Sequence, residues 1–276
     1  MSTHTFQLAG NAAEVYEAQK VPAIFGPLAE LTVDRAHPHT DDRVLDIACG
    51  TGIILRVLAK RLPKIEQLVG VDLNAGMLEV ARKLSAESGF EGDWRQGDVT
   101  ALPFEPASFT LCFCQQGLQY FPDKPKALSE IHRVLEPGGR LLLSLWSEVS
   151  PLFAAMGDAL EKHVSKEAAR RAVAPFAFRD QQVVEELLED AGLDLDDVRC
   201  VTIDRKMGPA DESFPKEIAG SPIAEDVDGL DPKILEKIVT DMATNLAAYR
   251  QGNGFSIPQS SYLFSCTKTS KEIPGR

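Results

Sequence analysis

The chain has 276 residues, of which 25% are charged and 44% are hydrophobic, the composition of an ordinary globular protein with one large domain or two small ones. Its 29 basic and 41 acidic residues give a formal net charge of -12, so the surface repels nucleic acid and anionic membranes, and we expect neither as a partner. The amino-terminal stretch is polar and no apolar run approaches the ~18 residues of a membrane span. We therefore expect a cytoplasmic protein without membrane insertion.

The cysteines and histidines show no arrangement typical of a metal site. His37 and His39 flank a proline, with no further ligands at a useful spacing. The cysteines lack paired metal-ligand spacing and are expected to be free thiols in a reducing compartment: Cys49, Cys112, Cys114, Cys200 and Cys266. The sequence therefore predicts no bound metal.

Residues 1–40 precede the first expected strand and contain two helical stretches. The sequence predicts one helix over 12–19 and another over roughly 28–34, with a break between them at Pro22 and Pro27. Taken by themselves, Tyr16, Ile24 and Phe25 would serve to cover one edge of a sheet.

The stretch from Val44 to Gly52 joins a short apolar run, interrupted by Asp46, to a glycine-rich turn. An apolar segment over 53–59 follows. This order predicts a buried strand, a tight turn and a helix, with glycines where the backbone bends sharply or a ligand approaches it. It is typical of a nucleotide pocket.

The spacing of acids and glycines narrows the choice of nucleotide. A dinucleotide loop has a third glycine three residues after the second, where this chain has Leu55. The next apolar run ends in Asp72, twenty residues beyond Gly52, where a carboxylate can accept both ribose hydroxyls. Asp98 follows a third short strand and is placed to accept from an exocyclic amine. Three acids and a glycine turn suit a ligand with an amino group, a ribose and an adenine, such as S-adenosylmethionine.

From residue 41 to 147, strands and helices alternate. Strands are expected at 43–48, 67–72, 93–97, 108–114 and 140–147, and helices at 52–61, 74–87 and 123–135. The strands are continuously apolar, as in a parallel sheet covered on both faces. We predict a doubly wound, Rossmann-like α/β fold with its ligand at the carboxyl ends of the strands. The Glu-Pro-Gly-Gly segment at 136–139 is interpreted as a helix stop and turn, because no phosphate-loop lysine follows it.

The chain beyond residue 147 is expected to be largely helical, with two further strands. Residues 148–178 favour helix with a break at Pro175, and 181–191 an amphipathic helix whose apolar face holds Val183, Val184, Leu187 and Leu188. Strands six and seven are expected at 198–203 and 261–266. Residues 211–250 form a helical insertion between them, too long for a plain hairpin, and long insertions are usually functional.

Five segments match a known family in order and spacing: VLDIACGTG (44–52), VGVDLNAGML (69–78), GDVTALPF (97–104), FTLCFCQQGLQYFPD (109–123) and LSEIHRVLEPGGRLLLS (128–144). With them, residues 44–147 resemble the core of a class I S-adenosylmethionine-dependent methyltransferase, and most resemble the small-molecule branch that includes quinone-biosynthesis methyltransferases. Two positions depart from the pattern. Ala48 stands where the family often has the first loop glycine, and Thr110 where it often has an aspartate.

The resemblance implies a single methyltransferase domain over 1–276 with a cofactor-binding core at 41–147. It implies a seven-stranded, mostly parallel sheet whose antiparallel end is formed by strands six and seven. Residues 1–40 and 211–250 would be the lid or acceptor segments, closing over the carboxyl edge of the sheet.

Carried over residue by residue, the resemblance places Asp46 at the cofactor's ammonium, directly or through water, Asp72 at the ribose and Asp98 at the adenine amine. Leu73, Met77 and Val99 would sandwich the adenine, and Gln115 would border the methyl group. The whole implied set is Asp46, Ala48, Gly50, Gly52, Asp72, Leu73, Met77, Asp98, Val99 and Gln115. Structural alternatives stay open: a helix N-cap for Asp72, a turn for Asp98 and core packing for the apolar three.

The implied methyl acceptor is a small molecule, which Gln116, Gln119 and Tyr120 could face. Methyl transfer from a sulfonium is an in-line displacement that alignment and desolvation can accelerate, so no obligatory catalytic dyad is expected. His132 is expected on a solvated helix face.

Two other function classes share part of the pattern. A nicotinamide-dependent oxidoreductase would also have the strand, the turn and the ribose acid, but Leu55 and Asp46 argue against it. A non-catalytic S-adenosylmethionine-binding protein would keep the core and lose the acceptor site.

Overall fold

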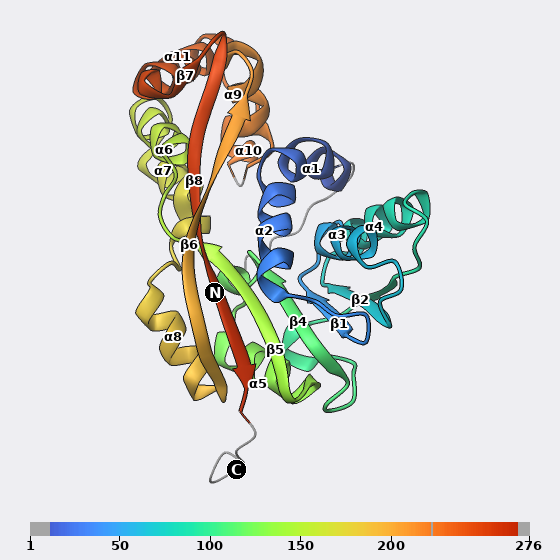
Figure 1. Ribbon diagram of the computed structural model, residues 1–276. Helices are drawn as coiled ribbons and strands as arrows, with labels where there is room; N and C mark the ends of the chain where they lie inside the picture. The colour runs from blue at the N-terminus through green and yellow to red at the C-terminus, as the bar shows by residue number, and fades with distance from the viewer. Residues whose placement is uncertain (1–11, 222, 270–276) are drawn as a thin grey trace. The chain divides into compact units, whose positions relative to one another are not determined.

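The computed structural model describes residues 12–221 and 223–269, which divide into two compact units (Figure 1). The first comprises Met1–Leu145, Asp180–Val201 and Tyr262–Arg276, and the second Trp146–Arg179 and Thr202–Ser261. The masked positions within these bounds, residues 1–11 of the expected 1–40 segment among them, lie outside the described residues.

The described strands form one sheet in the order β3-β2-β1-β4-β5-β8-β6. Its parallel part consists of β1 (Arg43–Ile47), β2 (Gln67–Asp72), β3 (Asp93–Gln96), β4 (Phe109–Gln115) and β5 (Leu135–Trp146). Strand β8 (Gly254–Lys268) lies between β5 and β6 (Leu193–Met207) and is antiparallel to both (Figure 1). The two-residue β7 (Arg250–Gln251) pairs with β8. The predicted doubly wound, mostly parallel sheet is confirmed, with β7 as an addition to the seven predicted strands.

Helices cover both faces of the sheet in the first unit. Helix α2 (Gly26–Ala36) packs with α3 (Ile53–Arg61), α1 (Ala12–Lys20) contacts α4 (Ala75–Glu87), and α5 (Lys124–Val134) packs with α8 (Gln181–Asp190) on the other face (Figure 1). Polar side chains begin three of these helices by accepting backbone N–H groups of the first turn: Asn74 for α4, Asp123 for α5 and Asp180 for α8.

The predicted break between the first two helices is wrong. Residues Val21–Phe25 form a π-helical turn that connects α1 to α2, with the Gly26 N–H donating to the Val21 carbonyl five residues back. Pro22 and Pro27 each take the second position of their segment, where the backbone changes from α-helix to π-helical turn and from that turn to α2. The helical backbone therefore continues past both prolines.

Strand β5 begins earlier than predicted, and the expected turn at 136–139 lies inside it. The register passes from Phe109 opposite Leu135 to Leu111 opposite Arg140, so β5 has extra residues at this point and forms a bulge. Gly138 adopts a left-handed φ of 79° within the bulge. Strands β6 and β8 are likewise longer than predicted.

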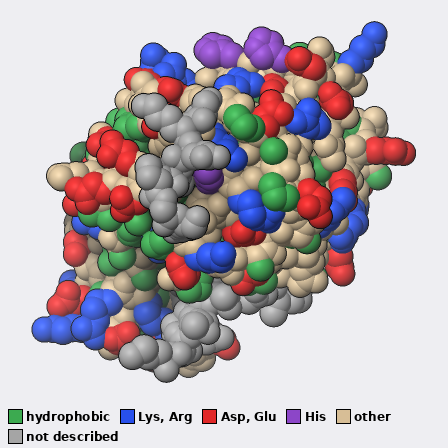
Figure 2. All heavy atoms as spheres, turned by 90° about the horizontal axis from the view of Figure 1, so that it is seen from below, with side chains coloured by type: hydrophobic (Ala, Val, Ile, Leu, Met, Phe, Trp, Pro, Cys, Tyr) green, Lys and Arg blue, Asp and Glu red, His purple; other side chains and the backbone are tan. Residues whose placement is uncertain are grey.

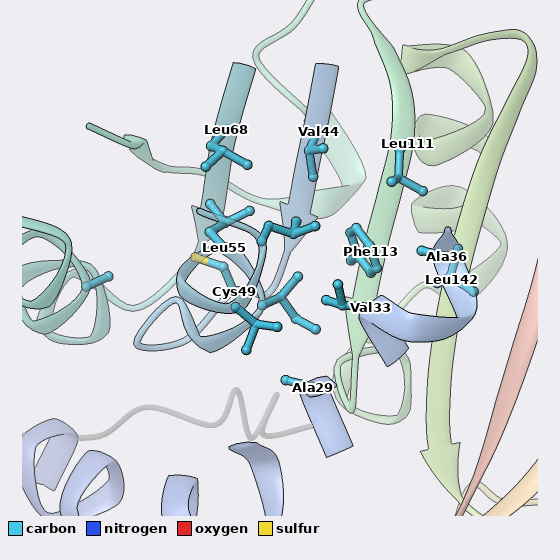
Figure 3. Close-up of a cluster of buried hydrophobic side chains, with 14 of the residues drawn as sticks. Ala29, Val33, Ala36, Val44, Cys49, Leu55, Leu68, Leu111, Phe113 and Leu142 are labelled. Atoms are coloured by element: carbon cyan, nitrogen blue, oxygen red, sulfur yellow. The ribbon is translucent and has the colours of Figure 1, made fainter. Parts of the chain in front are cut away.

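A buried hydrophobic cluster joins α2 and α3 to the sheet. Figure 3 shows Val33 of α2 beside Phe113 of β4 and Ala36 of α2 beside Leu142 of β5. The same cluster includes Ala29, Leu55 and Leu68. These side chains are at most 8% exposed. The core thus holds α3, and the loop that precedes it, firmly against β1 and β2.

Helix α8 buries less of its apolar face than predicted. Val184 and Leu188 are buried, Leu187 is half-buried, and Val183 is 41% exposed. The fully buried side chains follow the i, i+4 spacing, so one row of the predicted apolar face lies in the core and the rest is at its border.

The second unit consists of helices together with residues 202–207 of β6 and 254–261 of β8. Its helices are α6 (Pro151–His163), α7 (Lys166–Val173), α9 (Ala210–Ala219), α10 (Ala224–Val227) and α11 (Pro232–Asn245). Residues 211–250 are helical, as predicted, and contribute Phe214, Ile238 and Met242 to a core shared with α6. Arg205 and Glu217 form a buried ion pair within this unit.

The described surface carries mixed charges, and the cysteines form no disulfides. On the face in Figure 2, acidic and basic side chains are interspersed. Cys49, Cys112, Cys114 and Cys266 are buried, Cys200 is exposed, and all five are free. Within 12–221 and 223–269, we find neither a helix long and apolar enough to cross a membrane nor a cluster of three metal-ligating side chains.

Candidate functional site

Three neighbouring strands bring predicted site residues to one edge of the sheet. Asp46 lies near the end of β1, between Gly70 of β2 and Phe113 of β4 in the register. Asp72 is the last residue of β2 and Gln115 the last residue of β4. The chain order reverses between β1 and β4, and open α/β sheets bind ligands outside the carboxyl ends of the strands at such a point.

The turn after β1 has an unusual backbone. Ala48, Gly50 and Gly52 have left-handed φ values of 54°, 55° and 78°. Ala48 therefore adopts a conformation that glycine would occupy without strain. This explains why the methyltransferase family that the sequence resembles often has its first loop glycine at this position. A Cβ added to Gly50 would meet no described atom within 4 Å, so there is free space beside the loop.

A glycine is needed at position 52 for a different structural reason. A Cβ on this residue would lie 2.3 Å from the Trp94 ring, which also covers Gly70 of β2. The glycine thus permits α3 to pack on the sheet, and its predicted approach to the cofactor remains a prediction. Sequence reasoning did not single out Trp94, although a lone tryptophan in the otherwise polar strand β3 is a signal of an inward-facing side chain.

Asp46 is a buried carboxylate that the described chain leaves incompletely paired. Its side chain is 1% exposed, and its Oδ2 atom has no hydrogen-bond partner among the described residues. Burial raises the pKa of Asp46 well above its usual value, and the negative charge of Asp72 raises it further. An unpaired buried carboxylate is costly, and a ligand cation would offset that cost.

Asp72 is oriented by backbone donors on both sides. Its Oδ2 accepts from the Gly50 N–H and its Oδ1 from the Asn74 N–H, each at 2.8 Å. Burial raises the pKa of Asp72, and the backbone hydrogen bonds act in the opposite direction. The N-cap of α4 is Asn74, whose Oδ1 accepts from Gly76 and Met77, so the capping alternative for Asp72 is wrong.

The residues expected around an adenine differ in their surroundings. Asp98 is exposed and forms a turn, because its Oδ1 accepts from the Thr100 N–H and hydroxyl at 2.8 Å. Leu73 is 42% exposed at the end of β2, whereas Met77 is 5% exposed and packs in the core. Val99 is half-buried at the start of the short helix Val99–Ala101. Leu73 therefore has the surface that an adenine ring would cover.

The last residue of β4 and the segment that follows it supply three amides and a phenol: Gln115, Gln116, Gln119 and Tyr120. Gln115 accepts from the Thr32 hydroxyl at 3.3 Å and donates to the Phe25 carbonyl at 3.2 Å, which ties it to α2 and the π-helical turn. Gln116 is buried with a left-handed φ of 56° and accepts from Nε2 of Gln119 at 3.1 Å.

Tyr120 completes this segment. Desolvation raises the pKa of its hydroxyl to about 12, and the Gln119 side chain opposes the shift. The phenol therefore keeps its proton at neutral pH.

Helix α1 brings Glu17 and Tyr16 close to the site; the sequence left Tyr16 open as cover for a sheet edge or as part of the lid segment 1–40. Glu17 forms an ion pair with Arg56 in the first turn of α3, at 2.7 and 2.9 Å. The pKa of the adjacent Tyr16 is raised well above its usual value, mainly by burial and then by Tyr120, Asp72, Glu17 and Asp46. No local pattern marks this tyrosine, because its environment comes from strands far along the chain.

Two further features lie away from the carboxyl edge. An open hollow of about 630 Å³ lies near the start of β2 and β4 and is lined by Gln67, Arg95, Leu102, Pro103, Phe104, Glu105, Ser108 and Phe109. It contains none of the predicted residues. His132 is half-buried rather than solvated, and burial, followed by Lys268, lowers its pKa.

Comparison with known proteins agrees with this geometry. The family described as "Methyltransferase domain" matches residues 45–143. The chain is 33% identical over 174 residues to the ubiquinone/menaquinone biosynthesis C-methyltransferase UbiE of Neisseria meningitidis serogroup A, covering 59% of this chain and 71% of that protein. It is 39% identical over 113 residues to the demethylmenaquinone methyltransferase of Lactiplantibacillus plantarum, covering 40% and 48%.

Solved structures share the fold. A putative methyltransferase from Bacillus halodurans C-125 superposes with a TM-score of 0.60 at 21% identity, covering 88% of this chain and 99% of that one. Phosphoethanolamine N-methyltransferase 2 of Haemonchus contortus, in complex with S-adenosyl-L-methionine, has a TM-score of 0.59 at 21% identity, covering 94% and 57%.

The chain spans about half the length of the demethylmenaquinone methyltransferases that it matches, and the solved structures below 25% identity establish the fold alone. The match over most of the Neisseria protein, together with the domain match across β1 to β5, establishes the family. The chain belongs to the class I S-adenosylmethionine-dependent methyltransferases.

Proposed function

We propose that this protein transfers a methyl group from S-adenosylmethionine to a small-molecule acceptor at the carboxyl edge of β1, β2 and β4. The observation that carries the proposal is the Oδ2 atom of Asp46, which is buried and has no partner among the described residues. A ligand ammonium group would supply the charged hydrogen-bond partner that this carboxylate lacks, and the turn that follows β1 has open space at Gly50.

The other residues fit the remaining parts of this cofactor. Asp72 is held in place by two backbone N–H groups, and its unused lone pairs remain available to accept ribose hydroxyls. Leu73 offers an exposed apolar surface to an adenine, and Asp98 a carboxylate to its amine. The sulfonium of the bound cofactor supplies an activated methyl group for direct displacement.

The contribution of the chain to the reaction is alignment and exclusion of water. Gln116, Gln119 and Tyr120 follow β4, and we assign them to the acceptor side. Tyr120 keeps its proton, so it donates a hydrogen bond and does not act as a base. In-line displacement from a sulfonium requires a nucleophile held in line in a site without water, which positioning groups provide.

The names of relatives and the net charge support a small-molecule acceptor, and the buried thiols support a reducing compartment. Relatives named for ubiquinone, menaquinone and 2-phytyl-1,4-naphtoquinone support a small organic acceptor for this chain. A net charge of -12 disfavours nucleic acid. We also propose that the protein works in the cytoplasm, where buried free thiols stay reduced.

One experiment tests both halves of the proposal. Calorimetry should detect binding of S-adenosylmethionine, and mass spectrometry of a metabolite panel incubated with protein and cofactor should detect a product heavier by one methyl group. Binding without any methylated product would favour a non-catalytic binding protein. Binding of a nicotinamide cofactor in place of S-adenosylmethionine would refute the proposal.

A further inference from the structure

Tyr16 is fixed close to the end of β4 by a short series of contacts. Its ring stacks on Phe25, with ring centroids 5.2 Å apart and planes 24° from parallel. The Phe25 carbonyl accepts from Nε2 of Gln115, the last residue of β4, at 3.2 Å. These contacts place the tyrosine at the carboxyl edge of the sheet.

A second contact fixes the same turn of α1 next to the glycine loop. Glu17 pairs through both carboxylate oxygens with Nη2 of Arg56, and each of the two side chains is 18% exposed. Arg56 belongs to the first turn of α3, where its own N–H donates to the Gly52 carbonyl at 3.0 Å. Consecutive residues of α1 are thus attached to both sides of the candidate site.

The ring contact with Phe25 places Tyr16 on the same edge of the sheet as Asp46 and Asp72, and the negative charges of both carboxylates act on the pKa of its hydroxyl. Its pKa is raised well above the usual value, mainly by burial, and Tyr120, Asp72 and Asp46 contribute. The group therefore stays protonated and uncharged at neutral pH and is not a general base. Asp46 is assigned to the cofactor's ammonium and Asp72 to its ribose. In S-adenosylmethionine, the sulfonium joins these two ends.

We propose that the Tyr16 hydroxyl oxygen faces the sulfonium and methyl group of bound S-adenosylmethionine, making Tyr16 a further cofactor-contacting residue. This inference rests on the proposed function. The oxygen lone pairs would lie against the positive sulfonium and its polarised methyl hydrogens. The demethylated product, S-adenosylhomocysteine, has a neutral thioether at that position and gains much less from the same oxygen.

Calorimetric titration of wild type and Tyr16→Phe with each of the two ligands tests the proposal. Tyr16→Phe keeps the ring that stacks on Phe25 and removes only the hydroxyl. We expect its affinity for S-adenosylmethionine to fall roughly three- to tenfold, as for loss of one polar contact, and its affinity for S-adenosylhomocysteine to stay within about twofold.

Tyr262→Phe is the matched control. Tyr262 lies on β8 with its ring 6.0 Å from Phe264, and its replacement should leave both affinities unchanged. Thermal melting verifies that each variant is folded.

Two results would overturn the assignment: unchanged affinities for both ligands in Tyr16→Phe, or an equal loss for both. Either result with a wild type that binds normally leaves the proposed function intact. A wild type that binds neither ligand would refute the proposed function together with the role of Tyr16.

Discussion

At the scale of single residues, two aspartates at the ends of β1 and β2 have distinct environments. Asp72 satisfies both oxygens with backbone N–H groups, whereas Asp46 has a buried oxygen without a partner in the described chain. In the absence of ligand, Asp72 is therefore positioned by hydrogen bonds, while Asp46 carries an uncompensated desolvation cost. The two residues should respond differently to substitution.

Asp46→Asn should stabilise the ligand-free protein at neutral pH and weaken binding of S-adenosylmethionine. Burial raises the folded-state pKa of Asp46 above its unfolded value of about 3.9. The folded state then holds the proton more tightly, so stability falls as the pH rises from the unfolded pKa through the folded one, and the cost is complete above it.

Thermal melting of wild type and Asp46→Asn between pH 4 and 8 measures this effect. The variant should melt at a higher temperature near pH 7, with the difference shrinking toward pH 4. Its affinity for the cofactor should fall about ten- to a hundredfold, as for one charge-assisted hydrogen bond. A variant less stable at pH 7 with undiminished affinity would show that Asp46 is a structural residue.

Asp72→Ala should weaken cofactor binding strongly, because two ribose hydroxyls would lose a charged acceptor, each hydrogen bond contributing roughly 1.5 to 3 kcal/mol. It should also release the Gly50 and Asn74 N–H groups, so a modest loss of stability is expected. Asp93→Ala is the control. Asp93 lies on β3, the strand next to β2, where it is exposed and pairs with Arg95 of the same strand. Unchanged calorimetric affinity in folded Asp72→Ala would remove this residue from the site.

At the scale of elements, the turn between β1 and α3 separates two uses of glycine. Gly50 borders open space, whereas Gly52 lies against the Trp94 ring. The turn is kept in place by the Cys49 N–H, which donates to the Val71 carbonyl at 3.1 Å. One glycine thus provides room for a ligand and the other permits a helix to pack.

Gly52→Ala and Gly50→Ala should therefore have different effects. Gly52→Ala combines a left-handed φ with overpacking against Trp94 and should cost about 2 to 4 kcal/mol of unfolding free energy. Gly50→Ala should cost only about 1 to 2 kcal/mol of unfolding free energy, because its left-handed φ is unfavourable for alanine but its Cβ would contact nothing. The added methyl group would occupy the open space beside the loop, so cofactor binding should weaken. Chemical denaturation and calorimetry measure the two quantities. Equal stability losses would mean that Trp94 moves aside without cost.

At the scale of the whole molecule, each compact unit has its own hydrophobic core. In the first, the cluster around Leu55 and Phe113 supports the edge where the cofactor residues lie. In the second, Phe214 and Met242 from residues 211–250 pack with Leu160 of α6. The insertion is thus a structural part of its unit, in addition to the role in acceptor choice that we propose for it and for the described part of residues 1–40.

Replacing residues 211–250 by a short turn should abolish methyl transfer while leaving cofactor affinity within a few-fold. The deletion removes much of the second core and none of the first. Phe214→Ala is a smaller change in the same direction, expected to cost the second unit about 3 to 5 kcal/mol. Calorimetry and a methyl-transfer assay separate the two effects. A folded deletion variant with full turnover would place acceptor recognition around residues 115–120.

Most of the architecture could be predicted from sequence, because local patterns determine it. Continuous apolar runs identified β1, β2 and β4, and the glycine turn followed by an apolar helix located the binding edge. The ends of elements were less predictable. The π-helical turn at Val21–Phe25 and the bulge of β5 depend on packing and pairing partners far away in the chain.

The alternation of strands and helices over 41–147 was sufficient to predict the fold class, and five motifs in order and spacing between Val44 and Ser144 indicated the family. The tertiary structure decided the surroundings of each side chain. Asn74 rather than Asp72 caps α4, the Trp94 ring lies against Gly52, and Tyr16 stacks on Phe25 near the end of β4 from a helix outside the core motifs. The physical reason is that strand and turn signals arise from neighbouring residues in the chain, whereas burial, charge and hydrogen-bond partners are set by residues that only folding brings together.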